Sequence, residues 1–304
     1  MNRRIGIKKL TLLLLAFLIL ISVSSIGTAA VILVHQGDSI QTAVNNLVSG
    51  DVIIVKPGKY VENIKIAKEN LTIRSDSGDP NNTIIKARNS HADVFLLKAD
   101  DIKLSGFKIS GATEPSYAGI FLCSSDNCTI ENNILLNNSC VIYRWCATQD
   151  KISKNMANNN GVYGGILLAS SDFNILSGNT VSNNHNGIYM GTSNDNILSS
   201  NTIQNSDNLG FFICSRSNRN LVYNNYFNEN KITIKNGIGN TYNTIKTPGI
   251  NIIGGPYIGG NFWGKPDGTG VSQNAVNRGD GISDHVYANI TGSIYSDYLP
   301  LVYF

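Results

Sequence analysis

The chain lacks a surplus of basic charge once its first thirty residues are set aside. Those residues hold four of the 24 Lys and Arg residues and none of the 21 Asp and Glu residues, so the remainder has a net charge of −1. Proteins that bind nucleic acid neutralise its phosphates with clustered Lys and Arg. The sequence therefore predicts no nucleic-acid partner.

Long helical patterns are also missing. Between Val52 and Asn228 the apolar residues fall in short runs separated by polar turns, and no segment repeats with the period of an α-helix. A long unbroken apolar run occurs only from Leu12 to Ile21. These absences exclude a helical domain in the middle of the chain, and we expect no membrane span beyond the leader.

Residues 1–30 have the pattern of a secretory signal. Four basic residues precede the apolar run and small residues follow it, an order typical of a leader removed on export. The alternative is an uncleaved anchor, although the run is short for a membrane span. We expect a secreted or cell-surface protein, in which Asn-x-Ser/Thr sequons permit N-glycosylation without establishing it.

Candidate metal ligands are few and scattered. The four histidines do not cluster, and outside the leader the only methionines are Met156 and Met190. Copper sites require soft or imidazole ligands close together. Cys123 and Cys146 with a nearby donor would be one such arrangement, but a disulfide explains that pair more simply. We therefore do not expect copper as a cofactor.

What the sequence does contain is a repeat. From Gly119 to Asn228 an apolar triplet after glycine, a Ser/Asp/Asn turn, Ile or Leu, and then Asn before another apolar pair recur. The aligned asparagines are 22 to 24 residues apart: Asn133, Asn155, Asn179, Asn201 and Asn225. A fixed period of this length indicates the stacked coils of a solenoid.

Each coil would point alternate apolar residues inward and pair its strands in parallel with the next coil. One inward column would then consist of Ile120, Ile142, Ile166, Ile188 and Phe211. The recurring asparagines would stand at bends, where stacked amides can bond one another and the unpaired peptide groups. We interpret these asparagines as a structural ladder rather than as ligands.

The two ends of the chain differ from the repeat. Residues 31–230 are predicted to form the solenoid, with regular repeats over 119–228 and with Asp38 as the N-cap of a short helix over the first coil. Residues 231–304 are rich in Gly and Thr and lose the period. We expect them to cap the same domain, because a bare terminal coil would expose core and strand edges.

A mostly aromatic row occupies the outward positions between the inward residues. Its members are Phe121, Tyr143, Leu167, Tyr189 and Phe212, and Arg144 lies beside it. Flat rings on a rigid face suit the apolar faces of sugars, so these residues are the candidate ligand-binding set. Loops or the C-terminal segment could cover the row instead, and a register slip around Arg144 would reverse which residues face outward.

Catalytic patterns are weak. Asp126 and Asp172 occupy equivalent turns two coils apart, ~9.6 Å by strand spacing, within reach of a glycosidase mechanism. Both lie in Ser-x-Asp turns, where a carboxylate usually caps its own backbone. Arg144 and His185 are the candidate bases for a lyase or epimerase, and no recognisable signature surrounds either. The catalytic residues therefore stay unassigned.

Five cysteines in an exported chain suggest disulfides. Cys123 and Cys146 are 23 residues apart, about one coil, and are the predicted pair. Cys128 and Cys140 could then pair locally. Cys214 lies about three coils further on, or ~14 Å by strand spacing, which is too far to bridge. We expect Cys214 to be a lone buried thiol.

Three segments, taken in order, carry a family resemblance: GDSIQTAV…GDVIIVKPGKYVENI, the GI-x-L…N-x-I…NN coils, and NIIGG…GGNFW…GDGISD…DYLPL. Together they resemble the NosD-like, pectin-lyase-like right-handed parallel β-helix proteins. The resemblance implies a secreted or cell-surface protein of a kind often linked to carbohydrate binding or sugar processing. The founding member assists copper-site maturation in nitrous oxide reductase.

The closing segment of that family often looks like a calcium loop. Here Asp280 and Asp284 match the loop, whereas Val276 and Arg278 stand where its first two acids would be. Calcium prefers six to eight oxygen ligands, which two carboxylates do not supply without backbone carbonyls. The resemblance therefore implies a calcium site that is incomplete in this chain.

The predicted fold class is all-β, a right-handed single-stranded parallel β-helix with a short N-terminal capping helix and an irregular C-terminal cap. The predicted function is a non-catalytic carbohydrate-binding or cell-envelope interaction module, with a polysaccharide or envelope glycan as its partner. The alternatives are a polysaccharide lyase, epimerase or hydrolase, and metal delivery in the manner of NosD. Membrane contact is expected only through an uncleaved leader.

Overall fold

The computed structural model describes residues 29–277 and 279–304, without the side chains of Tyr143 and Arg144. The predicted leader therefore falls almost entirely outside the described residues. The chain divides into two compact units, of which the second, Val31–Phe304, holds all the strands that the structure describes. Among the described residues, no helix is long and apolar enough to cross a membrane.

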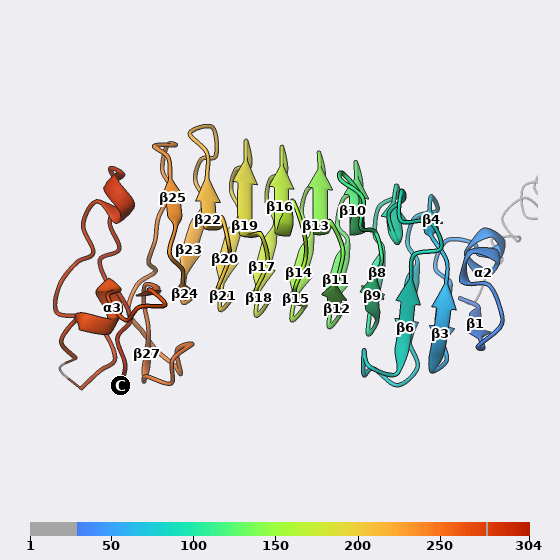
Figure 1. The fold of residues 1–304 in the computed structure, drawn as a ribbon, viewed down its shortest axis with the longest axis horizontal. Helices are drawn as coiled ribbons and strands as arrows, with labels where there is room; N and C mark the ends of the chain where they lie inside the picture. Colours follow the sequence, from blue (N-terminus) through green and yellow to red (C-terminus); the bar gives the residue numbers. More distant parts are fainter. Residues whose placement is uncertain (1–28, 278) are drawn as a thin grey trace, which may run out of the picture. The chain divides into compact units, whose positions relative to one another are not determined.

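The second unit is a parallel β-solenoid of about eight turns with little helix, as the sequence predicts. Figure 1 shows its coils following one another, and the strands form three long sheets. Sheet 1 consists of β1 (Val31–Val34), β2 (Val52–Val55), β5 (Thr72–Ser75), β8 (Lys103–Ser105), β11 (Thr129–Glu131), β14 (Lys151–Ser153), β17 (Ile175–Ser177), β20 (Ile197–Ser199) and β23 (Leu221–Tyr223).

The other two sheets have the same parallel pairing. Sheet 2 consists of β3 (Gly58–Val61), β6 (Thr83–Lys86), β9 (Lys108–Ser110), β12 (Ile134–Leu136), β15 (Met156–Asn158), β18 (Thr180–Ser182), β21 (Thr202–Gln204), β24 (Tyr226–Asn228) and β28 (Phe262–Gly264). Sheet 3 consists of β4 (Ile64–Ile66), β7 (Phe95–Leu97), β10 (Ala118–Cys123), β13 (Cys140–Trp145), β16 (Gly164–Ala169), β19 (Asn186–Gly191), β22 (Leu209–Ile213) and β25 (Ile232–Ile234).

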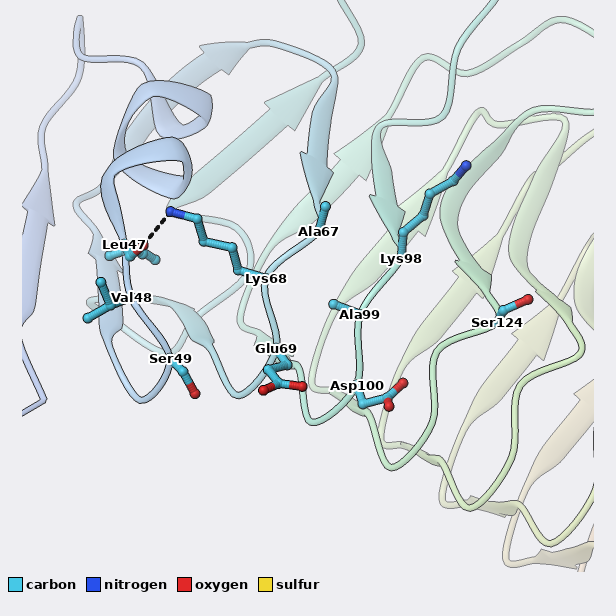
Figure 2. A pocket seen from close by; sticks show the side chains of 10 residues that line it. All are labelled: Leu47, Val48, Ser49, Ala67, Lys68, Glu69, Lys98, Ala99, Asp100 and Ser124. Carbon is cyan, nitrogen blue, oxygen red and sulfur yellow. Dashed lines mark hydrogen bonds between the residues drawn. The ribbon is translucent and has the colours of Figure 1, made fainter.

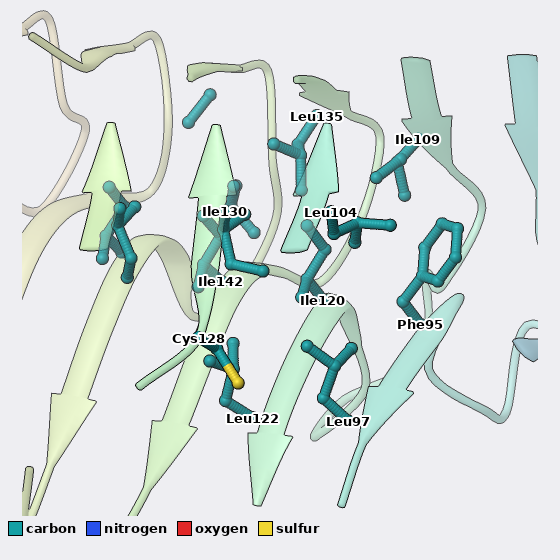
Figure 3. Close-up of a cluster of buried hydrophobic side chains, with 14 of the residues drawn as sticks. Phe95, Leu97, Leu104, Ile109, Ile120, Leu122, Cys128, Ile130, Leu135 and Ile142 are labelled. Atoms are coloured by element: carbon teal, nitrogen blue, oxygen red, sulfur yellow. The ribbon is translucent and has the colours of Figure 1, made fainter. Parts of the chain in front are cut away.

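Alternation within each strand directs apolar side chains into the interior. The predicted inward column is confirmed, since its members are in register in sheet 3 and almost fully buried: Ile120, Ile142, Ile166, Ile188 and Phe211. Figure 3 shows part of this interior, including Ile120 and Ile142 from adjacent strands. The inward residues of one coil cover those of the next, so a single coil cannot bury its own core.

The predicted asparagine ladder is present and runs through Asn133, Asn155, Asn179, Asn201 and Asn225 to Asn261. The Oδ1 atom of each asparagine accepts hydrogen bonds from the backbone N–H and the Nδ2 of the asparagine one coil earlier. Between Asn155 and Asn179 these bonds are 3.0 and 3.1 Å long. Each Nδ2 also donates to a strand carbonyl, as from Asn179 to Ile152 at 2.8 Å. The ladder thus pairs buried bend peptides that water cannot reach.

Other bends of the coil hold two further ladders. Asn138, Asn160 and Asn184 stack in the bend that leads into sheet 3. Asn174, Asn196, Asn220 and Asn240 stack in the bend that leads into sheet 1. These asparagines are buried as well, so stacked amides occur at all three kinds of bend. Carboxylates of Asp150 and Glu229 take the place of amides in some coils.

A short helix, α2 (Ile40–Asn46), closes the N-terminal end of the solenoid. Its N-cap is Ser39, whose Oγ accepts the N–H of Thr42 at 3.1 Å. The predicted N-cap, Asp38, lies one residue too early, and its carboxylate accepts the N–H of His35 at 2.8 Å instead. Both residue types favour N-caps, and only the local backbone decides between neighbours.

The side chain of Gln41 protects the exposed edge of β4. Its Oε1 accepts the N–H of Lys65 at 2.6 Å, and its Nε2 donates to the carbonyl of Lys65 at 3.1 Å. The amide therefore takes the place of a peptide group from the coil that is missing beyond β4. Such pairing of a terminal edge limits association with other strands.

Residues 231–304 extend two of the sheets and are otherwise irregular. β25 adds to sheet 3, and β28 adds to sheet 2, where the ring of Trp263 stacks on Phe227 with centroids 4.8 Å apart. The remaining elements are α3 (Val271–Asn274), the 3-10 turn η1 (Ile290–Gly292), and the antiparallel strands β26 (Thr247–Pro248) and β27 (Tyr257–Ile258). The loss of period at Lys231 therefore precedes the last strands of the solenoid.

Asp297 ends the first ladder. Its buried carboxylate accepts the N–H of Asn261 at 2.7 Å, the Nε1–H of Trp263 at 2.8 Å and the N–H of Leu299 at 3.0 Å. Burial raises the pKa of Asp297 to about 7, although these donors lower it in part. A carboxyl group thus takes the place of an amide where the ladder stops.

We expect Asn179→Ala to lower the free energy of unfolding by at least ~2 kcal/mol, because buried donors of Asn155 lose their acceptor. The measurement is denaturant unfolding followed by circular dichroism. Asn208→Ala is the control, since Asn208 is exposed, and it should change stability by no more than ~0.5 kcal/mol. Equal losses in the two variants would contradict the role of the ladder.

The stability contribution of Asp297 should decrease with rising pH. A raised pKa means that the fold favours the protonated form, so the contribution is complete below the ordinary pKa of 3.8 and is lost as the pH rises through about 7. Comparison with Asp297→Asn isolates the effect, which is at most ~4 kcal/mol. Melting temperatures of both proteins between pH 4 and about pH 8 test it, and parallel curves would exclude it.

Candidate functional site

The outer face of sheet 3 is the candidate ligand surface. Its strands align the predicted outward row and extend it by one residue, giving Leu96, Phe121, Tyr143, Leu167, Tyr189 and Phe212 in successive strands. The described side chains of this row are half-buried. The row therefore forms a continuous apolar strip along the solenoid.

Two neighbouring rings of this strip, Tyr189 and Phe212, are turned toward one another. Tyr189 and Phe212 stack with centroids 4.4 Å apart and planes 13° apart. Strands in a sheet are ~4.8 Å apart, close to the distance at which flat rings stack. The stacked faces of Tyr189 and Phe212 are thus covered, and a sugar ring could not lie on them.

Arg144 does not belong to this strip. The register aligns it with Leu122 and Leu168, whose side chains are buried in the interior. β13 keeps the register of its neighbours, so the backbone places Arg144 at an inward-alternating position and Tyr143 at an outward one. The predicted place of the Arg144 side chain beside the row stays a prediction. The side chains of both residues lie outside the described part of the structure.

Trp145 is an aromatic residue that the outward-row pattern does not single out. It ends β13 with 53% of its side-chain surface exposed. Its register neighbours are Cys123 on one side and Ala169 on the other, and Gly191 follows Ala169. Its neighbours on the C-terminal side are therefore small. The feature of the sequence that could have singled out Trp145 is its position in the one coil that departs from the repeat.

Three hollows follow one another along the side of sheet 3 at which its strands begin. The first, about 320 Å³, is lined by Ser39, Gln41, Thr42, Glu62, Asn63 and Arg88. The second, about 270 Å³, is lined among others by Asn63, Lys65, Asp93, Leu96 and Tyr117. The third, about 150 Å³, is lined by Ser116, Cys140, Tyr163 and Leu167. Asn63 is common to the first two, and Ser116 precedes Tyr117, so the hollows form one line.

Two titratable groups in these hollows have raised pKa values. Burial raises the pKa of Asp93, although its Oδ1 accepts the N–H of Ala118 at 2.7 Å, which lowers the pKa in part. Burial also raises the pKa of the Cys140 thiol to about 12. At neutral pH the third hollow therefore contains a neutral thiol and not a nucleophilic thiolate.

A wider depression of about 610 Å³ lies on the other side of sheet 3, where its strands end (Figure 2). Nζ of Lys68 donates to the carbonyls of Asn45 and Leu47 and so holds the end of α2. In Figure 2 the side chains of Lys98 and Asp100 project in different directions. The polar groups of this depression do not converge on one point, so the line of hollows is the better candidate.

The predicted carboxylate pair has a structural role. Oδ1 of Asp126 accepts the N–H of Thr148 at 2.7 Å, and Oδ1 of Asp172 accepts the N–H of Asn194 at 2.7 Å. Each carboxylate thus pairs a turn peptide of the next coil. His185 is half-buried in the bend before sheet 3, where its N–H donates to the carbonyl of Asn160 at 3.2 Å.

In the predicted calcium loop, Asp280 lies next to the ammonium group of Lys246. Its Oδ2 forms an ion pair with Nζ of Lys246, and this hydrogen bond lowers the pKa of Asp280. Asp284 is exposed. No group of three or more His, Cys, Asp or Glu side chains that could hold a metal ion occurs in the described ranges. Calcium at Asp280 and Asp284 stays a prediction.

The predicted disulfide between Cys123 and Cys146 is not formed, and both thiols are free. The coil that separates them is 22 residues long at this point, because Ile120 aligns with Ile142. Cys123 therefore aligns with Trp145, and Cys146 follows one residue later at a left-handed backbone position with φ of 52°. Cys146 is 23 residues after Cys123, one residue more than the 22-residue coil, so the two cysteines are not opposite each other in the sheet.

Cys214 is half-buried rather than buried as predicted. Burial acts to raise the pKa of its thiol, but hydrogen bonds from Ser217, Thr192 and Arg216 outweigh that effect and lower the pKa. Cys128 and Cys140 are both buried, and no disulfide joins them. The five cysteines therefore differ widely in access and in acidity.

A family model described as "Periplasmic copper-binding protein (NosD)" matches residues 44–268, which is most of the chain. The chain belongs to the NosD family. This NosD-family chain is also 35% identical over 136 residues to a "Cell surface glycoprotein" of Methanothermus fervidus, a match that covers 43% of the chain and 21% of that protein. The chain thus spans about a fifth of the length of this curated relative.

Solved structures with low sequence identity are similar to this NosD-family chain. Pectate lyase Pel9A matches with a TM-score of 0.55 and 13% identity, over 75% of this chain and 74% of that one. The A-module of mannuronan C-5 epimerase AlgE4 from Azotobacter vinelandii matches with a TM-score of 0.49 and 14% identity, over 66% of each chain. At such identities the likeness to Pel9A shows the fold alone.

Thiol labelling should separate the cysteines. A maleimide at neutral pH should modify the exposed Cys146 and the acidified Cys214 while Cys128 and Cys140 stay unmodified, because burial blocks access and the pKa of Cys140 is about 12. Peptide mass spectrometry before and after denaturation measures this. A disulfide-linked peptide containing Cys123 and Cys146 would contradict the described arrangement.

Proposed function

We propose that this NosD-family protein works outside the cytoplasm, in the cell envelope, where it binds a linear glycan along the side of sheet 3 marked by the three hollows. The observation that carries the proposal is the line of hollows itself. The family description names a periplasmic protein, and the relative from Methanothermus fervidus is named a cell surface glycoprotein; both support the location.

The shape of the hollows suits an extended chain. They run from the residues before β4 to Leu167 in β16, which is four strand spacings or ~19 Å. The solenoid makes this line rigid, because each coil is fixed by its neighbours. A rigid extended groove requires little ordering when a linear polymer binds, which favours affinity.

The side chains of the hollows suit sugars. Tyr117 and Tyr163 provide aromatic surface, and Leu96 and Leu167 provide aliphatic surface. Lys65 supplies hydrogen-bond donors for hydroxyl or carboxylate groups, whereas the Nδ2 of Asn63 already donates to backbone carbonyls, among them that of Asp93 at 2.8 Å. This mixture of apolar surface with a few polar groups is typical of small-ligand sites.

Asp93 supports a second candidate function, the processing of a uronan. A half-buried carboxyl group with a raised pKa in a groove can act as a general acid or base. Polysaccharide lyase, epimerase or hydrolase activity usually needs further charged groups at the reacting bond. Asp93 and Lys65 are the only charged residues that line the second hollow in the described structure, so binding without catalysis is the stronger proposal.

Copper delivery has less support in this chain. The family description names copper binding. In the ranges that the structure describes, however, no group of three or more His, Cys, Asp or Glu side chains could hold a metal ion. Thioether and imidazole ligands would also have to converge, and Met190 is buried in the core.

Affinity electrophoresis in gels containing polygalacturonate, alginate or polysaccharide extracted from the producing cells tests the main proposal. We expect retardation in at least one gel and a loss of affinity of about tenfold or more in Tyr117→Ala, as for a central aromatic contact. Tyr223→Ala is the matched control, because Tyr223 is a half-buried tyrosine on the outer face of sheet 1.

Three outcomes decide between the candidates. Equal losses of affinity in Tyr117→Ala and Tyr223→Ala, or no retardation in any gel, would contradict the assignment of the glycan to these hollows. Release of unsaturated or reducing ends from polygalacturonate or alginate, abolished by Asp93→Asn, would establish the enzyme instead. Retardation without product release supports the binding module.

A further inference from the structure

Five asparagines of the chain lie in Asn-x-Ser/Thr sequons: Asn70, Asn81, Asn127, Asn137 and Asn289. All five are exposed. Four of them stand at left-handed turn positions, with φ between 51° and 59°, and Asn81 lies in the loop between β5 and β6. The sequons are therefore at places where an attached group would project into solvent.

The buried ladder asparagines carry no sequon. The residue two positions after each rung of the first ladder is an inward core residue, as Val181 is after Asn179 and Ile203 after Asn201. The architecture by itself thus keeps sequons off the ladder. Exposure of the sequon asparagines alone is consequently weak support for a modification, and a second observation is needed.

Two sequon hydroxyl groups provide that observation. Thr83 Oγ1 and Ser139 Oγ belong to the sequons of Asn81 and Asn137, and both are buried without a hydrogen-bond partner. A buried hydroxyl group without a partner costs stability and requires an explanation. The repeat does not need a hydroxyl group at the position of Ser139, because the equivalent residue one coil later is Gly161.

We propose that the chain carries N-linked oligosaccharides at its sequon asparagines, and that Thr83 and Ser139 are retained for recognition by the transferase. The sequon hydroxyl group is what distinguishes an acceptor asparagine from the many others in this chain. Both groups are inaccessible in the fold, so glycans at Asn81 and Asn137 are added before these coils close. The inference rests on the proposed extracytoplasmic location.

The donor would be an oligosaccharide linked through phosphate or diphosphate to a membrane lipid. The Nδ2 atom of the asparagine forms a bond to the anomeric carbon, and the bond from that carbon to the phosphate oxygen breaks. The amide loses one proton, and the lipid phosphate leaves with the electron pair. No oxidation or reduction occurs in this transfer.

The sequon asparagines differ in their distance from the proposed binding site along the chain, and Asn137 precedes Cys140 of the third hollow by three residues. None of the five sequon asparagines belongs to a strand of sheet 3; Asn70 and Asn127 lie in the bend between sheets 3 and 1, and Asn137 lies in the bend before β13. Attached glycans would therefore cover bends of the solenoid. A glycan at Asn70 or Asn127 would stand where the strands of sheet 3 end, away from the hollows, whereas a glycan at Asn137 would stand beside the third hollow.

The test uses the full chain purified from its own cells or from a host that attaches N-linked glycans to exported proteins. Mass spectrometry of proteolytic peptides should show a glycan mass on the peptide that contains Asn137. Ser139→Ala and Asn137→Gln should both abolish that mass. Ser125→Ala is the control, because Ser125 has a buried hydroxyl group without a partner but lies outside any sequon; it should keep the glycan.

Two results would overturn the inference. One is unmodified asparagine at all five sequons in protein that cell fractionation places outside the cytoplasm. The other is a glycan at Asn137 that persists in Ser139→Ala. Protein found only in the cytoplasm would refute the proposed location as well. Gel retardation by polysaccharide depends on the hollows and not on glycan transfer. Either proposal can therefore fail while the other holds.

Discussion

The buried peptide groups at the bends are the constraint on which this structure depends. Stacking of coils places each bend under the next, where water cannot pair the N–H and C=O groups that leave the sheets. An asparagine side chain has an acceptor and two donors. One asparagine per bend can therefore form hydrogen bonds both with the asparagine of the neighbouring coil and with a strand carbonyl. The ladder fixes where each coil bends but not its length, since successive rungs are 22 residues apart at Asn133, 24 at Asn155 and 36 at Asn225.

The ends of the first ladder show what happens when the stack of asparagines stops. At one end Oδ1 of Asn133 accepts the N–H of Phe107, and at the other Asp297 supplies a carboxylate in place of the next amide. Gln41 performs a similar task for the edge of β4. Gln41 and Asp297 thus replace groups of a missing coil, and the burial of Asp297 explains its raised pKa.

The same spacing decides what the outer face can offer. Strands ~4.8 Å apart bring aromatic side chains of adjacent coils into stacking distance, so Tyr189 and Phe212 cover each other's faces. Accessible hollows arise instead where residues before the strands of sheet 3, such as Asn63, Asp93 and Tyr117, rise beside the strip. The bends and loops therefore carry the variation on which a ligand could depend.

The sequence by itself determined the solenoid, the inward column and the first asparagine ladder, because these depend on a periodic pattern in which every coil repeats the same local chemistry. It also located the outward row from alternation along the strands. Only the tertiary structure decided the register of β13, which sets Cys123 against Trp145 and Arg144 among inward residues, since a difference of one residue reverses every side chain in a strand. The hollows, the second and third ladders and the burial of Thr83 and Ser139 likewise depend on contacts between residues more than twenty positions apart, and no local pattern specifies those contacts.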